Sequence, residues 1–268
     1  MVNIVNMNQV TWIREQKTIL DRIDWQVAKG EHWAILGLNG SGKTTLLNIL
    51  NGYIWPTKGQ VSVLGHRFGE VDLRELRKSI GWVSSSFQER LYPTDKAQNI
   101  VISGKHASIG LYEKPDEADD EQARYWMERL SCSHLYDRAY QSCSQGEKQK
   151  ILIARALMAS PRLLILDEAT NGLDFLSREN LLQSISELAA EPDAPTLLFV
   201  THHVEEIMPI FNKTLLIRGG RSFAQGHSKE MLTSGELTAF FQIPVEVRWQ
   251  DGRAWLTAIT HRQENKER

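Results

Sequence analysis

The sequence predicts an α/β fold: a core with a mixed β-sheet, an antiparallel β part at the N-terminus and an inserted α-helical subdomain. Residues 163–166 and 196–200 form near-continuous apolar runs, which are typical of strands covered by helices on both faces. Helix-like segments at 147–158 and 177–190 alternate with these runs. Such an alternation of buried strands and helices predicts parallel strands within one sheet.

The remaining elements follow in chain order. Residues 4–12 and 21–27 are strand-like and would form the N-terminal β part. From residue 84 to about residue 142 strand-like runs vanish and proline and glycine interrupt the chain, which predicts a mostly helical insertion. The alternating residues 245–249 predict a late strand. The predicted division is a core of residues 1–88 and 143–235, a helical subdomain of residues 89–142 and a C-terminal tail of residues 236–268.

A glycine-rich loop is the most specific motif of the core. Residues 37–45 match the phosphate-binding pattern G-x-x-x-x-G-K-[ST] at every fixed position, between a strand-like and a helix-like segment. In such a loop backbone N–H groups close around phosphate oxygens, Lys43 adds a positive charge, and the Thr44 hydroxyl ligates Mg²⁺. The predicted nucleotide-binding residues of the loop are Gly37, Leu38, Asn39, Gly40, Ser41, Gly42, Lys43, Thr44 and Thr45.

An acidic pair, Asp167 and Glu168, ends the apolar run 163–166. The carboxyl end of a buried strand is where a nucleotide site requires such groups. We expect Asp167 to hold Mg²⁺, directly or through water, and Glu168 to orient and deprotonate the attacking water. The sequence therefore predicts phosphate chemistry at this edge of the sheet.

Ser144 and Glu147 have the S-x-x-E spacing of a capping box, which predicts that a helix begins there. A helix N-terminus binds anions, so the chain offers a second surface for phosphate. On local grounds alone, a box that only caps its helix is the simpler interpretation.

Composition limits the classes of function. The chain has 268 residues and a formal net charge of −2, so no overall basic field favours nucleic acid. No apolar stretch approaches the roughly 18 residues of a membrane span, and the first residues lack a signal-peptide pattern. Cys132 and Cys143 are expected to be free thiols in a reducing cytosol. These observations predict a cytoplasmic protein.

The ordered set of motifs resembles that of the ATP-binding-cassette (ABC) ATPases, over about residues 4–230. The family's motifs correspond to Walker A at 37–45, a Q-loop glutamine at Gln88, the signature at 143–147, Walker B at 163–168, a D-loop at 171–174 and a switch histidine at His202. The resemblance implies a P-loop NTPase fold and an ATPase that uses ATP and Mg²⁺. Cys143 replaces the usual leucine and Gln145 the first glycine, and the latter is expected to weaken the nucleotide contact.

The resemblance also implies roles and partners. Two cassettes associate head to tail, so that each ATP lies between the Walker A loop of one and the signature of the other. The implied trans-signature residues are Ser144, Gln145, Gly146 and Glu147. Gln88 would sense Mg²⁺ and water, His202, rather than its neighbour His203, would contact the γ-phosphate, and Asp174 would lie at the interface. Trp12 is the candidate for stacking on adenine.

Three functions remain in competition at this point. The first is the nucleotide-binding subunit of an ABC transporter, acting as a homodimer or with a homologous cassette. It would lie at the inner face of the membrane through integral permease subunits. The alternative is a soluble ABC ATPase acting on nucleic acid, ribosomes or protein. A small-molecule kinase would leave the signature and the histidine segment unexplained. The transported substrate and the direction of transport are not encoded in these motifs.

Overall fold

The computed structural model describes residues 3–259 except residues 89, 107 and 113. Its central sheet has six strands in the order β10-β9-β3-β8-β7-β6. These strands are β3 (Trp33–Gly37), β6 (Ile80–Ser84), β7 (Leu163–Asp167), β8 (Thr196–Thr201), β9 (Lys213–Arg218) and β10 (Arg221–His227). All neighbours pair parallel except β9 and β10, which pair antiparallel. The predicted α/β class with a mixed sheet is confirmed.

The N-terminal part is a second, antiparallel sheet in the order β2-β1-β4-β5. Its strands are β1 (Asn3–Arg14), β2 (Lys17–Ala28), β4 (Lys58–Val63) and β5 (His66–Arg67). β1 and β2 are longer than the predicted runs because they form one hairpin whose two turn residues, Glu15 and Gln16, have φ of 49° and 65°. Two positive φ values are typical of a two-residue turn that matches the strand twist.

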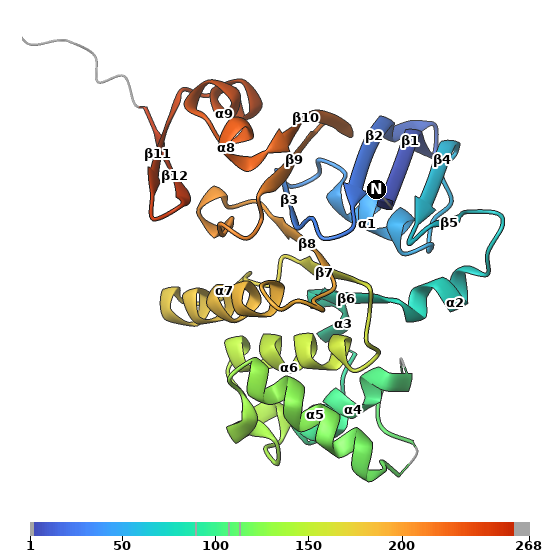
Figure 1. Ribbon diagram of the computed structural model, residues 1–268. Helices are drawn as coiled ribbons and strands as arrows, with labels where there is room; N and C mark the ends of the chain where they lie inside the picture. The colour runs from blue at the N-terminus through green and yellow to red at the C-terminus, as the bar shows by residue number, and fades with distance from the viewer. Residues whose placement is uncertain (1–2, 89, 107, 113, 260–268) are drawn as a thin grey trace, which may run out of the picture.

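Helices cover the face of the central sheet that points away from the antiparallel sheet (Figure 1). They are α3 (Ser85–Gln88), α4 (Ala97–Ser103), α5 (Glu117–Arg129), α6 (Gln145–Leu157) and α7 (Phe175–Ala189), with short 3-10 turns at Gly104–His106, Ser133–Leu135 and Tyr140–Ser142. α4, α5 and α6 form a lobe at the bottom of the view, with α7 between this lobe and the sheet edge. α6 contacts both α5 and α7, so the division at residue 142 stays a prediction.

Side chains of the central strands alternate between two hydrophobic clusters. In β3, Ala34 and Leu36 join the cluster on the helical side, whereas Trp33 and Ile35 join the cluster under the antiparallel sheet. This two-sided burial explains why the central strands are apolar at every position rather than at every second one. Each fully buried leucine or isoleucine contributes about 1.5–3 kcal/mol to stability.

The remaining elements join and extend these layers. They are α1 (Lys43–Leu50), α2 (Leu73–Lys78), the 3-10 turn η4 (Val204–Glu206), α8 (Ser228–Met231), α9 (Ser234–Phe241), β11 (Val245–Gln250) and β12 (Arg253–Ala258). β11 and β12 pair as a separate hairpin beside α9, which confirms the predicted late strand (Figure 1). In the part of the chain that the structure describes, no helix combines the length and apolarity needed to span a bilayer.

Candidate active site

The glycine-rich loop joins the end of β3 to the start of α1, as predicted. Gly40 and Gly42 have φ of 75° and 107°, a region that other residues enter only with strain. A Cβ on Gly37 would lie 2.5 Å from the Ser41 Oγ and 2.9 Å from the Ile217 carbonyl oxygen. The backbone therefore closes more tightly at Gly37 than any side chain would allow.

This loop forms the wall of a depression of about 410 Å³. It is lined by Ile19, Asn39, Gly40, Ser41, Gly42, Lys43, Thr44, Thr45, Ser84, Asp167 and Glu168. The structure thus brings together the predicted phosphate loop and the predicted acidic pair. Ile19, from β2, supplies an apolar wall that the sequence did not reveal. Trp12 is not in this lining: it is partly buried in β1 against the core of the antiparallel sheet, and its adenine role stays a prediction.

Lys43 is the first residue of α1 and is almost fully buried, with 6% of its surface exposed. Its Nζ donates a hydrogen bond to the Gly37 carbonyl oxygen at 2.8 Å and lies 3.4 Å from Glu168 Oε1. The Ser41 Oγ is buried and has no hydrogen-bond partner among the described residues. Because a buried hydroxyl without a partner is costly, this atom indicates a place for an anionic ligand.

The acidic pair lies where two parallel strands end side by side, since Asp167 of β7 pairs in register with Ser84 of β6. Burial and the neighbouring negative charge of Glu168 raise the pKa of Asp167 to about 6, and the charge of Lys43 opposes this only in part. Glu168 itself has a φ of 51°, an unusual conformation that costs on the order of 1 kcal/mol. The site therefore carries more negative charge than its own lysine offsets.

Replacing Asp167 with Asn is expected to stabilise the nucleotide-free protein at neutral pH. The folded-state pKa of Asp167, about 6, is above the ordinary value of 3.8, so the folded protein binds this proton more tightly than the unfolded chain does. Ionised Asp167 therefore lowers the free energy of unfolding. This loss of stability is absent below pH 3.8, grows as the pH rises to 6, and is complete above pH 6. Denaturant unfolding at pH 7.5 should show a gain of about 3 kcal/mol for Asp167→Asn, shrinking towards pH 4. A variant that is less stable at pH 7.5 would contradict this account.

Two histidines follow β8, and only one of them reaches the acidic pair. The Nδ1 of His202 lies 3.6 Å from Glu168 Oε1 and is buried without a hydrogen-bond partner among the described residues. His203 is more exposed, and its Nδ1 lies 3.5 Å from Glu205 Oε1 instead. The geometry supports the choice of His202 over His203.

Gln88, at the end of α3, does not line the depression; its side chain lies against the start of α6. Its Nε2 donates to Gln145 Oε1 at 2.9 Å, and its Oε1 accepts from Gln149 Nε2 at 3.2 Å. Gln145 is the first residue of α6 and is not among the residues with positive φ, so no glycine is required there. Gln145, which was expected only to weaken the nucleotide contact, therefore also accepts a hydrogen bond from Gln88.

The capping box is confirmed. The Ser144 Oγ accepts from the Glu147 backbone N–H at 3.3 Å, and Glu147 Oε2 accepts from the Ser144 N–H at 2.7 Å. Cys143 is buried in the core on the helical side, so it fills an apolar position although it is not leucine. Gly146 faces Ser177 of α7, where a Cβ would come within 3.1 Å of the Ser177 Cβ.

The signature residues and Asp174 stand apart from the depression, since none of Ser144–Glu147 and Asp174 belongs to its lining. Ser144 and Gln145 are exposed at the start of α6. Asp174 caps α7 by accepting from the Ser177 N–H and Oγ at 2.9 and 2.7 Å, contacts that also lower its pKa. The depression and the exposed start of α6 therefore lie at separate places on one chain.

Comparison with known proteins agrees with these geometries. The family described as "ABC transporter" matches residues 20–171, more than half of the chain. The chain is 50% identical to an uncharacterized ABC transporter ATP-binding protein, YlmA, of Bacillus subtilis (strain 168), over 95% of this chain and 97% of that protein. It is 32% identical to the molybdate import ATP-binding protein MolC of Haemophilus influenzae, over 87% and 86% of the two chains.

Among solved structures, the chain is similar to that of a metal-chelate type ABC transporter in an inward-facing conformation. The two share 28% identity with a TM-score of 0.77, over 97% of this chain and 99% of the other. Sequence motifs, site geometry and relatives thus agree. The chain belongs to the ABC transporter family and is an ATP-binding, ATP-hydrolysing subunit that powers a transporter.

Proposed function

We propose that two copies of this chain bind ATP between them, head to tail. The loop around Lys43 in one copy would hold the phosphates from one side, and the start of α6 at Ser144 in the other copy would close over them. The observation that carries this proposal is that the capped helix N-terminus is exposed and does not belong to the depression of its own chain. ATP would then act as a bridge, and its hydrolysis would release the two copies.

The residues of the depression suit Mg²⁺ as well as phosphate. Burial raises the pKa of Asp167 and the negative charge of Glu168 adds to this effect, so a divalent cation would favour the ionised carboxylates here. Mg²⁺ prefers one or two carboxylates, substrate phosphates and water, and Asp167 and Thr44 both line the depression. Bound Mg²⁺ would supply charge neutralisation at the phosphate oxygens. For Gln88 to act as the third ligand, its amide must first leave Gln145 and Gln149.

Each of the four side chains discussed next has a separate role in the proposed mechanism. Lys43 would exchange the carbonyl oxygen of Gly37 for phosphate oxygens. Glu168 would accept the proton of the attacking water, because its carboxylate lies within the same depression. His202 would contact the γ-phosphate from beside Glu168, with Nδ1 3.6 Å from the Glu168 carboxylate. Asp174 would lie at the interface between the two copies.

Mixing two inactive variants tests the head-to-tail pairing. Lys43→Ala removes the phosphate contact of the loop, and Ser144→Asp keeps a helix cap while placing a negative charge towards phosphate. Each variant alone should hydrolyse almost no ATP, because both of its composite sites are damaged. The mixture should regain activity, since a mixed dimer contains one intact site. Two preparations of the same variant, mixed in the same way, provide the control. A mixed dimer that stays inactive would contradict the pairing.

We also propose that integral membrane permease subunits hold this dimer at the inner face of the cell membrane. The support is the family itself, whose members are named as ATP-binding proteins of transporters. Purifying the tagged chain from detergent-solubilised membranes tests this partner. We expect an integral membrane protein in a fixed ratio to the chain; isolation of the active dimer alone from the same membranes would oppose it.

A further inference from the structure

The C-terminal hairpin of β11 and β12 has no part in the site described so far. Its two-residue turn, Asp251 and Gly252, has φ of 50° and 76°. A Cβ on Gly252 would lie 3.0 Å from the Pro209 Cγ, so the turn packs closely on the segment that follows η4. This turn places Arg253, the first residue of β12, against the main body of the protein.

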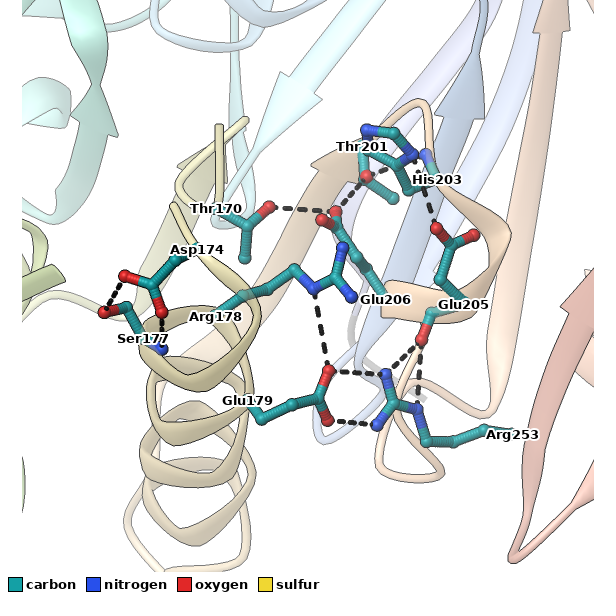
Figure 2. Close-up of polar contacts among 10 residues, drawn as sticks. All are labelled: Thr170, Asp174, Ser177, Arg178, Glu179, Thr201, His203, Glu205, Glu206 and Arg253. Carbon is teal, nitrogen blue, oxygen red and sulfur yellow. Dashed lines mark hydrogen bonds and ion pairs between the residues drawn. The ribbon is translucent and has the colours of Figure 1, made fainter. Parts of the chain in front are cut away.

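Arg253 joins two elements that are distant in sequence (Figure 2). Its Nε donates to the Glu205 carbonyl oxygen of η4 at 3.0 Å, and its Nη2 donates to the same oxygen. Its two terminal nitrogens also contact both carboxylate oxygens of Glu179 in α7, with Nη2 3.3 Å from Oε1. Only 12% of the Arg253 side chain is exposed. A planar guanidinium is suited to hold a carboxylate and a carbonyl oxygen in one fixed geometry.

The turn η4 also contacts the two segments that carry Glu168 and His202. Glu206 is 2% exposed, and its Oε2 accepts hydrogen bonds from the hydroxyls of Thr170, at 2.8 Å, and Thr201. Thr201 immediately precedes His202, and Thr170 lies two residues after Glu168. Figure 2 shows these contacts on the same turn that Arg253 holds. A shift of η4 would therefore move both segments.

The second partner of Arg253 lies near the start of α7. Glu179 lies two residues beyond Ser177, which bonds with the capping residue Asp174. Its pKa is held below the ordinary value, first by the hydrogen bond from Arg253. Because the carboxylate is thus ionised at neutral pH, its contact with the guanidinium is a charge-assisted one. The guanidinium consequently fixes the position of α7 relative to η4.

We propose that Arg253 is a positioning residue for ATP hydrolysis. It holds η4 and α7 in the arrangement that keeps His202 beside Glu168 and directs Asp174 towards the interface. This inference rests on the roles proposed above for His202 and Asp174. Misplacing a reacting group by about 1 Å costs up to about a hundredfold in rate, so a remote anchor has a measurable effect on turnover. Arg253 lies outside the lining of the depression, so ATP binding should depend on it much less.

The test is steady-state ATP hydrolysis by the full chain carrying Arg253→Ala. We expect kcat to fall about tenfold while KM for ATP changes less than about twofold. Arg253→Lys should recover only part of kcat, because lysine keeps the charge but not the planar fork. Arg248→Ala is the matched control: Arg248 belongs to the same hairpin and is exposed, and among the described residues its side chain pairs only with Glu246, at 3.0 and 3.1 Å. It should leave kcat and KM unchanged.

Three results would overturn the proposal: an unchanged kcat for Arg253→Ala, a loss confined to KM, or an equal loss in Arg248→Ala. If Arg253→Ala does not fold, Glu179→Gln, which keeps the side-chain shape, decides instead. It should lower kcat in the same direction, and a normal kcat would reject the proposal. The Glu168→Gln variant distinguishes a failure of the Arg253 proposal from a failure of the proposed active site. If Glu168→Gln is inactive and Arg253→Ala turns over normally, only the role of Arg253 fails; if Glu168→Gln turns over normally, the proposed site fails.

Discussion

Replacing Glu168 with Gln should reduce ATP hydrolysis about a hundred- to ten-thousandfold while ATP binding persists, because the change removes a general base but little volume. The amide cannot accept the proton of the attacking water. The substitution also removes a negative charge that lies 3.4 Å from the Lys43 Nζ, beside the proposed phosphate position. Bound ATP would no longer be consumed, so the ATP-bridged dimer should accumulate.

Phosphate release and light scattering measure the two parts of this result. The variant should double in mass on addition of ATP, and the wild-type protein should do so only transiently. Glu187→Gln provides a control of the same chemistry: Glu187 is exposed on α7, and among the described residues its side chain accepts a hydrogen bond only from Gln183, at 2.8 Å. It should hydrolyse ATP at the normal rate. A Glu168→Gln protein that stays monomeric with ATP and phosphorylates a small molecule would refute the cassette mechanism.

Replacing His202 with Ala should have the second largest effect, a fall in kcat of about a hundredfold. The reason is its position: Nδ1 lies 3.6 Å from the carboxylate of Glu168, and this atom has no hydrogen-bond partner among the described residues. A ligand oxygen would provide the missing partner. Removing the ring would take away a contact to the γ-phosphate that the backbone cannot replace.

His203→Ala is the matched control for this prediction, since it removes the same ring one residue away. Its ring faces Glu205 rather than Glu168, so kcat should change less than about threefold. Single-turnover hydrolysis with saturating ATP would separate this chemical effect from binding. If His203→Ala were the slower variant, the assignment of the switch histidine within Thr201–His203 would be wrong.

The predictions that held were those that depend on neighbours in sequence. The capping box at Ser144 and Glu147 needs only a spacing of three residues, and it is present as predicted. The glycine-rich loop likewise follows from fixed spacings between a strand and a helix, and the structure has both. The apolar run 163–166 indicated β7 because strands that are buried on both faces leave no polar position.

The features that the sequence did not reveal join residues far apart in the chain. Gln88 contacts Gln145, 57 positions away, because the end of α3 lies beside the start of α6. Ile19 enters the depression from the antiparallel sheet, which no local pattern relates to the glycine-rich loop. Trp12, chosen for its position before the loop, packs on the core of that sheet instead of lining the depression.

By itself the sequence determined the α/β class, the phosphate loop and the order of the motifs, because backbone hydrogen bonding and periodic burial act over a few residues. Only the tertiary structure decided how closely His202 approaches Glu168, how far burial raises the pKa of Asp167, and that Arg253 holds Glu179 across 74 positions. These properties depend on distances and on exclusion of water, which exist only once the sheets and helices have packed together.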